Sequence, residues 1–180
     1  QYLGDVSVAA RAHAVLTGDT TMMKKAISDF CHSCFICDGM MAVSTSSLMQ
    51  EIADYSLQFP AQVLWVYRTD GDIEFLRSAA PYVSRVYNYF LGYEREDGLI
   101  EGVYDKWNLV DWPANLRDGY DFPLTRPIGD GVHNVLNAFW CGFLQATDEI
   151  YRILGLAQTG KTERAIDSFI KCFYSEKSGL

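Results

Sequence analysis

The sequence predicts an all-α fold built from αα-hairpin repeats, and three observations lead to this prediction. Short turns related to Thr-Gly-Asp recur along the chain, each between two stretches with helical periodicity. A second kind of turn, Gly followed by an aliphatic residue, recurs where the second stretch of each pair ends. No segment alternates apolar and polar residues convincingly in the way that a half-buried strand does.

The first kind of turn joins the two helices of each expected hairpin. It occurs at 16–23 (LTGDTTMM), 68–75 (RTDGDIEF) and 158–165 (QTGKTERA). Glycine suits the left-handed backbone at a helix C-terminus, and the next residue is placed to cap the following helix. We therefore expect Asp19 and Asp72 to be N-caps. The third copy has Lys161 at this position, so Thr159 or Thr162 is expected to take the role.

The second kind of turn marks the end of each hairpin. It occurs at 37–41 (CDGMM), 96–100 (EDGLI) and 177–180 (KSGL). The unit of helix, tight turn, helix and return loop thus occurs three times. We expect residues 1–180 to form a single partial domain of three αα-hairpins. The chain lacks an initiator Met and stops where its repeat would continue, so we expect it to be a piece of a longer protein.

Apolar residues recur at helical spacing in the stretches 5–17, 72–92 and 132–154. The residues expected to face the core are Val8, Ala9, Ala12 and Leu16 in the first stretch, Phe75, Leu76, Ala79, Val83, Val86, Tyr87 and Phe90 in the second, and Val135, Leu136, Phe139, Phe143, Ala146, Ile150 and Leu154 in the third. Pro60 and Pro81 fall within helical patterns, where they either kink a helix or occupy its first turn.

The charge and apolar content exclude some partners. The formal net charge of −8 argues against nucleic acid or an anionic membrane as the main partner. The longest apolar stretch, near 135–146, is too short to cross a bilayer, so no membrane partner is expected. Residues 1–10 lack the pattern of a signal peptide. We expect neither a cofactor nor a metal.

The segment CHSCFICDG (31–39) carries three of the five cysteines. Their spacing resembles the first ligands of a ferredoxin-type cluster, but the fourth Cys and its Pro are missing. Cys141 and Cys172 stand alone and supply no second zinc-ligand pair. We therefore expect buried, structural cysteines at the end of a helix. Metal binding remains the alternative, and an adventitious disulfide at Cys37 is a further one.

Two stretches offer residues for a binding site. The loop 104–124 carries two Trp, three Tyr or Phe, four Asp and one Arg, a mixture that suits a carbohydrate pocket. The alternative is a loop whose aromatic side chains pack on helix ends. Asp5, in QYLGD, is either an N-cap or a site carboxylate. Among the histidines, His13 and His32 lie within helical patterns, whereas His133 opens a helix and could face the pocket.

An ordered set of segments resembles the catalytic domain of bacterial α-L-rhamnosidases. The segments are QYLGD, LTGD, IADYSLQFPAQVLWVYRTDGDIEFLRSAAPYVSRVYNYF, VDWP and NVLNAFWCGFLQATDEIYRILG. The resemblance implies a six-hairpin glycosidase, in which twelve helices form an (α/α)6 toroid, and three hairpins would be half of it. It also implies an inverting hydrolase that removes terminal α-L-rhamnose from glycans or glycosides, in the periplasm or outside the cell.

The resemblance assigns site residues. The family's Tyr/Trp-x-Gly-Asp element maps to Tyr2, Gly4 and Asp5, with Asp5 lining the sugar site as the catalytic candidate. The substrate-binding candidates are Tyr2, Asp54, Tyr55, Asp111, Trp112, Arg117 and Asp118. The family's general acid precedes Tyr2, and its general base lies beyond Leu180. This chain is therefore expected to hold part of the sugar-binding wall without the full catalytic pair.

Two other functions compete with this interpretation. One is a helical-repeat scaffold that binds a partner without chemistry. The other is a different (α/α)6 carbohydrate-active enzyme, such as a polysaccharide lyase or an unsaturated-uronyl hydrolase. For a half-toroid we expect exposed apolar edges and self-association through them.

Overall fold

The computed structural model describes residues 2–33, 39, 41, 51–103 and 132–177. Its helices are α1 (Leu3–Thr17), α2 (Thr21–Cys31), α3 (Ala53–Leu57), α4 (Phe59–Asp70), α5 (Ile73–Leu91), α6 (Asn134–Leu154) and α7 (Thr162–Phe173). Two isolated β-bridges, Glu94 with Ile100 and Glu101 with Val132, accompany the helices. The predicted all-α fold is confirmed.

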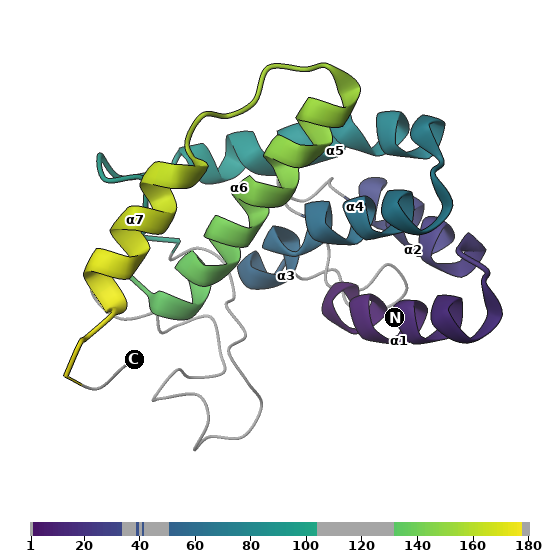
Figure 1. Cartoon of the computed structure of the whole chain (residues 1–180), viewed down its shortest axis with the longest axis horizontal. Coiled ribbons are helices and arrows are strands. Elements are labelled where there is room, and N and C mark those ends of the chain that lie inside the picture. Colours follow the sequence, from purple (N-terminus) through teal and green to yellow (C-terminus); the bar gives the residue numbers. More distant parts are fainter. Residues whose placement is uncertain (1, 34–38, 40, 42–50, 104–131, 178–180) are drawn as a thin grey trace.

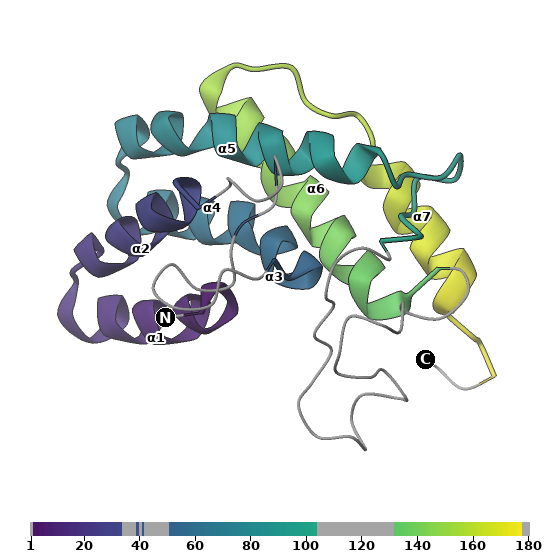
Figure 2. The same ribbon diagram turned by 180° about the vertical axis from the view of Figure 1, so that it is seen from behind.

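The helices form three pairs joined by short turns. α1 packs on α2, α4 on α5, and α6 on α7, while α4 also contacts both α2 and α6. The α1–α2 pair lies at one end of the molecule and α7 at the other (Figures 1 and 2). α6 passes in front of α5 in Figure 1 and behind it in Figure 2, so these two helices lie in different layers.

The predicted glycines end the first helix of both hairpins and Asp72 is the predicted N-cap, but the prediction that Asp19 is an N-cap is wrong. Gly18 and Gly71 end α1 and α4 with a left-handed φ of 73° each. Asp72 is the N-cap of α5, and its Oδ1 accepts a hydrogen bond from the Phe75 backbone N–H at 3.0 Å. Asp19 lies one residue before the N-cap of α2, but its Oδ1 accepts a hydrogen bond from the Thr21 N–H at 2.8 Å.

The third turn differs from the prediction. α6 ends at Gly155, and the N-cap of α7 is Lys161, which makes no side-chain capping bond. Asp148 of α6 fixes the turn from outside: its carboxylate accepts hydrogen bonds from the Thr159 N–H and the Thr162 hydroxyl, each at 2.6 Å. The prediction that Thr159 or Thr162 is the N-cap is therefore wrong, although both residues bond to Asp148.

The predicted apolar stripes of the second and third stretches are largely buried. In α5 and α6 the buried members are Leu76, Ala79, Val83, Val86, Phe90, Leu136, Phe143, Ala146 and Ile150. Pro60 lies in the first turn of α4, and Pro81 lies inside α5.

The stripe predicted for the first stretch is wrong. Its members Val8 and Leu16 are 72% and 84% exposed, and α1 instead buries Leu3, Val6, Ala10 and Ala14. Apolar residues occur on every side of this helix. Periodicity alone therefore could not select the buried face.

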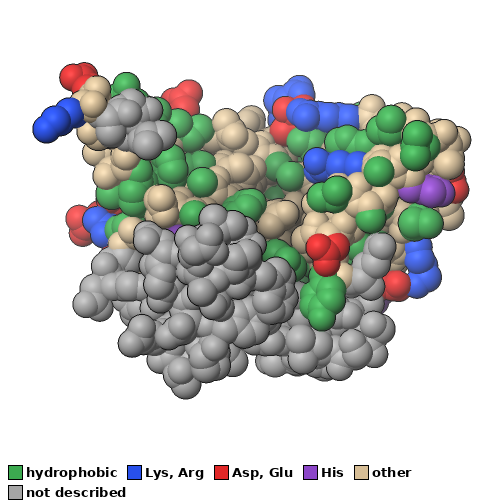
Figure 3. Space-filling view, turned by 90° about the horizontal axis from the view of Figure 1, so that it is seen from below, with side chains coloured by type: hydrophobic (Ala, Val, Ile, Leu, Met, Phe, Trp, Pro, Cys, Tyr) green, Lys and Arg blue, Asp and Glu red, His purple; other side chains and the backbone are tan. Residues whose placement is uncertain are grey.

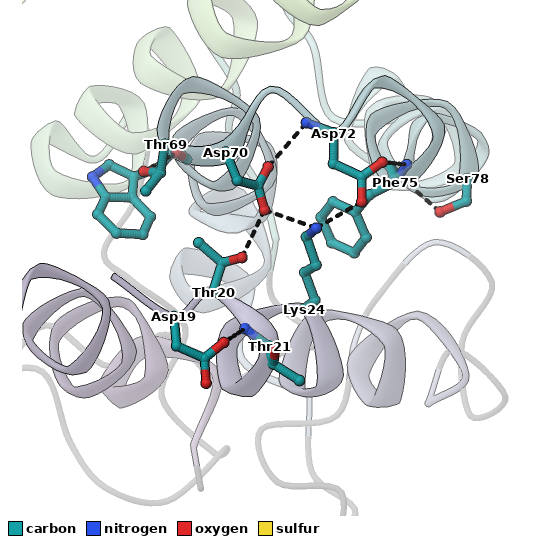
Figure 4. A network of polar contacts seen from close by, with 10 residues as sticks. Asp19, Thr20, Thr21, Lys24, Thr69, Asp70, Asp72, Phe75 and Ser78 are labelled. Atoms are coloured by element: carbon teal, nitrogen blue, oxygen red, sulfur yellow. Dashed lines mark hydrogen bonds and ion pairs between the residues drawn. The ribbon is translucent and has the colours of Figure 1, made fainter. Parts of the chain in front are cut away.

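A polar network joins the first two hairpin turns (Figure 4). Lys24 of α2 contacts Asp70 Oδ2 at 2.7 Å and Asp72 Oδ2 at 2.6 Å. The Thr20 hydroxyl donates to Asp70 Oδ2 at 2.6 Å. Burial alone would raise the pKa of Asp70, but hydrogen bonds from Lys24 and Thr20 outweigh it and lower that pKa. The hydrogen bond from Lys24 is also the main cause of the lowered pKa of Asp72.

Two side chains of α6 hold the segment that follows α5. Asn137, which is fully buried, accepts a hydrogen bond from the Ile100 N–H at 2.8 Å and donates one to the Ile100 carbonyl at 2.9 Å. The Trp140 indole N–H donates to the Gly98 carbonyl at 3.0 Å. Gly98 itself has a left-handed φ of 89°. These bonds satisfy backbone groups of an irregular segment that burial would otherwise leave unpaired.

Hydrophobic side chains also reach the surface. Figure 3 shows them on the face seen from below, beside charged side chains. The large exposed ones are Tyr2, Val8, Val15, Leu16, Met22, Leu156, Ile170 and Tyr174. In the part of the chain that the structure describes, no helix has the length and apolar character needed to cross a membrane.

Replacing Asn137 with Ala should lower the free energy of unfolding by about 3 kcal/mol, because it leaves both backbone groups of Ile100 without their partner. Asn134→Ala is the matched control, since Asn134 is exposed and bonds only its neighbour Val135 among the contacts described. Urea unfolding, monitored by circular dichroism, measures the unfolding free energy of both variants. Equal losses in the two variants would contradict the role given to Asn137.

The stabilising effect of Lys24 should depend on pH. Carboxyl groups with a lowered pKa contribute stability above their unfolded-state pKa of about 4. That contribution disappears as pH falls through their folded-state values. The difference in unfolding free energy between the parent chain and Lys24→Gln should therefore be present at pH 7 and shrink below pH ~4. Lys25→Gln, which breaks an exposed pair with Asp29, should change stability by no more than about 0.5 kcal/mol. A difference for Lys24→Gln that does not change with pH would refute this account.

Candidate functional site

α1 contacts α3, and α3 also contacts α4 and α6. The Gln62 side-chain amide of α4 donates to the Leu3 carbonyl of α1 at 2.9 Å. Gly4 lies directly against the Tyr55 ring: a Cβ added at Gly4 would be 2.7 Å from Tyr55 Cζ. The structure thus brings together QYLGD and ADYS, two segments about fifty residues apart that the family resemblance assigns to one pocket.

Tyr2 and Asp5 lie at the open side of this junction. Tyr2 is the N-cap of α1, is 40% exposed, and accepts a hydrogen bond from the Val6 N–H through its backbone carbonyl. Asp5 is exposed and lies in the first turn of α1. It is therefore not the N-cap, which was the alternative prediction for this residue. A carboxylate in the first turn is favoured by the helix dipole, and it remains accessible to a ligand.

The two predicted residues of α3, Asp54 and Tyr55, differ in their burial. Asp54 is only 4% exposed and lies in the first turn of α3, so its carboxylate belongs to the interior. Tyr55 is half-buried, with its ring on Gly4. Tyr55 therefore presents its ring to α1 at Gly4, whereas Asp54 is buried.

Four predicted site residues lie outside the described residues: Asp111, Trp112, Arg117 and Asp118. The described residues nearest to them in sequence are Val103 and Val132. Val132 pairs with Glu101 in an isolated bridge, and α6 begins two residues later. The two ends of the segment 104–131 are thus joined at the N-terminal end of α6.

The histidines have mainly structural surroundings. His133 is buried and caps α6, where its Nδ1 accepts a hydrogen bond from the Leu136 N–H at 3.2 Å. A neutral imidazole that accepts at Nδ1 carries its proton on Nε2. His32 is exposed at the end of α2, and its Nδ1 lies 2.7 Å from the Ser28 carbonyl oxygen. His13 is half-buried in α1.

The described cysteines lie in apolar surroundings or at the surface. Cys31 and Cys141 are buried in the hydrophobic core, and burial raises the pKa of Cys141 to about 11. Cys172 is exposed, and Cys34 and Cys37 lie outside the described residues. Within 2–33, 39, 41, 51–103 and 132–177, no group of three His, Cys, Asp or Glu side chains is arranged to hold a metal ion.

The sequence did not identify three polar residues near this junction. Glu51 and Gln62 are buried, and Arg11 is half-buried with its guanidinium carbon 5.6 Å from the centre of the Trp65 ring. Glu51 directly precedes the apolar start of α3, where an isolated carboxylate is a weak signal. Arg11 and Gln62 are polar residues within helices, and nothing in the sequence marks Arg11 as lying over an aromatic ring or Gln62 as fully buried.

Comparison with known proteins supports the fold. No protein-family model and no curated protein matches the chain. A solved structure, the GH78 family rhamnosidase of Bacillus sp. GL1, is similar with a TM-score of 0.63 and 17% sequence identity over 89% of this chain. The match covers 16% of that chain, so this protein spans about a sixth of its structural neighbour. At this identity the similarity establishes a shared helical fold.

The contact between Gly4 and Tyr55 predicts opposite effects for two Gly→Ala substitutions. Gly142 in α6 has open space where a Cβ would stand, so Gly142→Ala should raise the free energy of unfolding by about 1 kcal/mol. Gly4→Ala should lower it by about 1–3 kcal/mol, because the methyl group overlaps the Tyr55 ring. Thermal unfolding measures the stability change in both variants.

A double variant identifies the cause. In a Tyr55→Leu background, Gly4→Ala should lose most of its cost, since the overlapping ring is absent. Stabilisation by Gly4→Ala in the parent chain, comparable to that by Gly142→Ala, would contradict the contact.

Proposed function

We propose that this chain is part of a glycoside hydrolase that removes terminal α-L-rhamnose by inversion. In this proposal residues 1–180 are three of the six hairpins of a catalytic domain. The similarity of the helical fold to a GH78 family rhamnosidase over 89% of the chain supports it. The ordered sequence segments that resemble this family supply a second line of support.

The observation that carries the proposal is the contact between Gly4 and Tyr55. Gly4, which the exposed Asp5 follows directly in the sequence, lies against the Tyr55 ring, and Tyr2 opens the same helix. Aromatic rings cover the apolar face of a sugar, and a carboxylate accepts hydrogen bonds from its hydroxyl groups. We assign Tyr2 and Tyr55 to the wall of the sugar site and Asp5 to its floor.

Hydrolysis with inversion needs two carboxyl groups separated by roughly 6.5–9.5 Å, with a water molecule between them. Asp54 is buried, so Asp5 is the accessible carboxylate of the predicted set that lies within the described residues. We propose that the catalytic pair is completed by carboxylates outside residues 1–180. Asp111, Trp112, Arg117 and Asp118 remain predicted members of the same site.

The proposal also gives a reason for the exposed apolar residues of α1. Val8, Val15 and Leu16 are 72–84% exposed, and adjoining hairpins of a complete toroid would cover them. Self-association of this chain through the same surface remains a prediction.

We expect this chain to bind L-rhamnose weakly, with a dissociation constant on the order of 1 mM, which corresponds to a binding free energy of about −4 kcal/mol. Asp5→Asn should weaken binding by at least about tenfold, because it removes a charge-assisted acceptor. Titration calorimetry with L-rhamnose, and with D-glucose for comparison, measures this. The matched control is Asp29→Asn, which removes the same charge from the exposed pair on α2.

Weaker rhamnose binding by Asp5→Asn with an unchanged melting temperature would support the site. No saturable binding of rhamnose by the parent chain would favour the non-catalytic scaffold.

A version extended at both ends should hydrolyse an aryl α-L-rhamnoside, whereas the present chain should not. Turnover of uronic-acid substrates alone would point to the other class of (α/α)6 enzyme.

A further inference from the structure

The exposed side of α1 carries a continuous apolar stripe. Val8, Val15 and Leu16 are 72%, 77% and 84% exposed, and Ala9 and Ala12 between them are exposed as well. Residues three, four and seven positions apart lie on the same face of an α-helix, so these five side chains adjoin one another. We call these five residues the outer stripe. None of them is polar or charged.

The opposite side of α1 is apolar too, and it is buried. Leu3, Val6, Ala10 and Ala14 pack against the rest of the molecule. A helix that is apolar on all sides is normally buried on all sides. Only one side of α1 is covered in the part of the chain that the structure describes. Its composition therefore indicates that the outer stripe is an interaction surface.

The arrangement of the outer stripe matches a second, antiparallel copy of itself. Val8 and Leu16 lie equally far from Ala12 along the helix, and so do Ala9 and Val15. A two-fold axis at Ala12 therefore places Val8 against Leu16 of the second copy, and Ala9 against Val15 of the second copy. Such a contact is isologous, which is the commonest kind in protein dimers. The small side chain of Ala12 at the axis allows the two helices to approach closely.

A second apolar face, on α7, competes less well for this role. Ile170 and Tyr174 are 51% and 54% exposed there, at the end of the molecule away from α1 (Figures 1 and 2). Their neighbours on α7, Ile166 and Phe169, already pack against the core. Less apolar surface is therefore uncovered on α7 than on α1, where three large side chains are more than 70% exposed.

The size and charge of the outer stripe set the strength of association. Interfaces that bury less than ~1,200 Å² in total belong to weak complexes, and five side chains from each copy, two of them alanine, make a small interface. Exposed carboxylates, Asp5 and Asp19, flank the stripe at its two ends. Antiparallel pairing brings Asp5 near Asp19 of the second copy, so added salt should strengthen association by screening this repulsion.

We propose that this chain forms a weak two-fold dimer through the outer stripe, with antiparallel α1 helices and Ala12 at the axis. The dissociation constant is on the order of 0.1 mM. The proposal gives the self-association expected from the sequence a surface, a symmetry and a register. It does not depend on the proposed rhamnosidase function, under which an adjoining hairpin of a longer protein competes for the same surface.

Sedimentation equilibrium of the full chain, over concentrations on both sides of this constant, tests the surface. Ala12→Glu should weaken the dimer at least tenfold, because it places two carboxylates together at the axis. Ala12 is exposed, so circular dichroism should show an unchanged helix content. The matched control is Ile170→Glu, which puts the same carboxylate on the exposed apolar face of α7 and should leave the dimer intact.

Disulfide cross-linking tests the register. In a Cys172→Ser background, which removes the exposed cysteine, a mixture of Val8→Cys and Leu16→Cys chains should form a cross-linked dimer on mild oxidation. Neither variant alone should do so. The two copies of residue 8 are separated by about 12 Å along the paired helices, which is beyond the reach of a disulfide. The Cys172→Ser chain, oxidised in parallel, measures cross-linking through the native cysteines.

A monomer at all concentrations, an unchanged dimer in Ala12→Glu, or equal cross-linking by each single variant would overturn the proposal. Loss of the dimer in Ile170→Glu with an intact dimer in Ala12→Glu would assign the association to α7 instead. Ala12→Glu should leave L-rhamnose binding intact, because Ala12 is not among the predicted sugar-site residues. Asp5→Asn should weaken rhamnose binding and leave the dimer at least as stable, so either proposal can fail while the other stands.

Discussion

A buried hydrogen bond from the Gln62 amide to the Leu3 carbonyl links α1 to α4, in addition to the packing of α1 on α2 and α3. Burial of an amide is unfavourable unless its polar atoms are bonded, so this bond restricts the position of α1 along α4. It places Gly4 under the Tyr55 ring, where a larger residue would overlap the ring.

The hairpin turns explain why the site lies where it does. Gly18, Gly71 and Gly155 end α1, α4 and α6 in left-handed conformations, and the chain then returns through α2, α5 and α7. The N-terminal ends of α1 and α4 meet through Gln62 and Leu3, away from the turns that Lys24 links. The ion pairs of Lys24 with Asp70 and Asp72 therefore lie at the hairpin turns, whereas the Gln62–Leu3 bond lies at the other end of α1.

Local features of the sequence predicted most of the fold. Left-handed glycines, the Asp72 cap and the apolar stripes of α5 and α6 depend on nearest neighbours and helical periodicity, which a sequence displays directly. The inward face of α1 could not be predicted, because its apolar residues surround the helix. The Asp148 contacts with the third turn were also missed, since they join residues more than ten positions apart. In the candidate site, the family resemblance predicted that QYLGD and ADYS lie together, and Gly4 does lie against the Tyr55 ring. The burial of Asp54 and Gln62 depends on tertiary packing, which the sequence does not display.

The central claim is that a sugar binds where the N-terminal ends of α1 and α3 meet. Intermolecular nuclear Overhauser effects between L-rhamnose and the protein test it most directly, because they report proximity whether or not the chain is catalytic. The account predicts contacts from the rhamnose methyl group or ring protons to the aromatic protons of Tyr55 and Tyr2. Contacts confined to other parts of the molecule, such as α7, would contradict it.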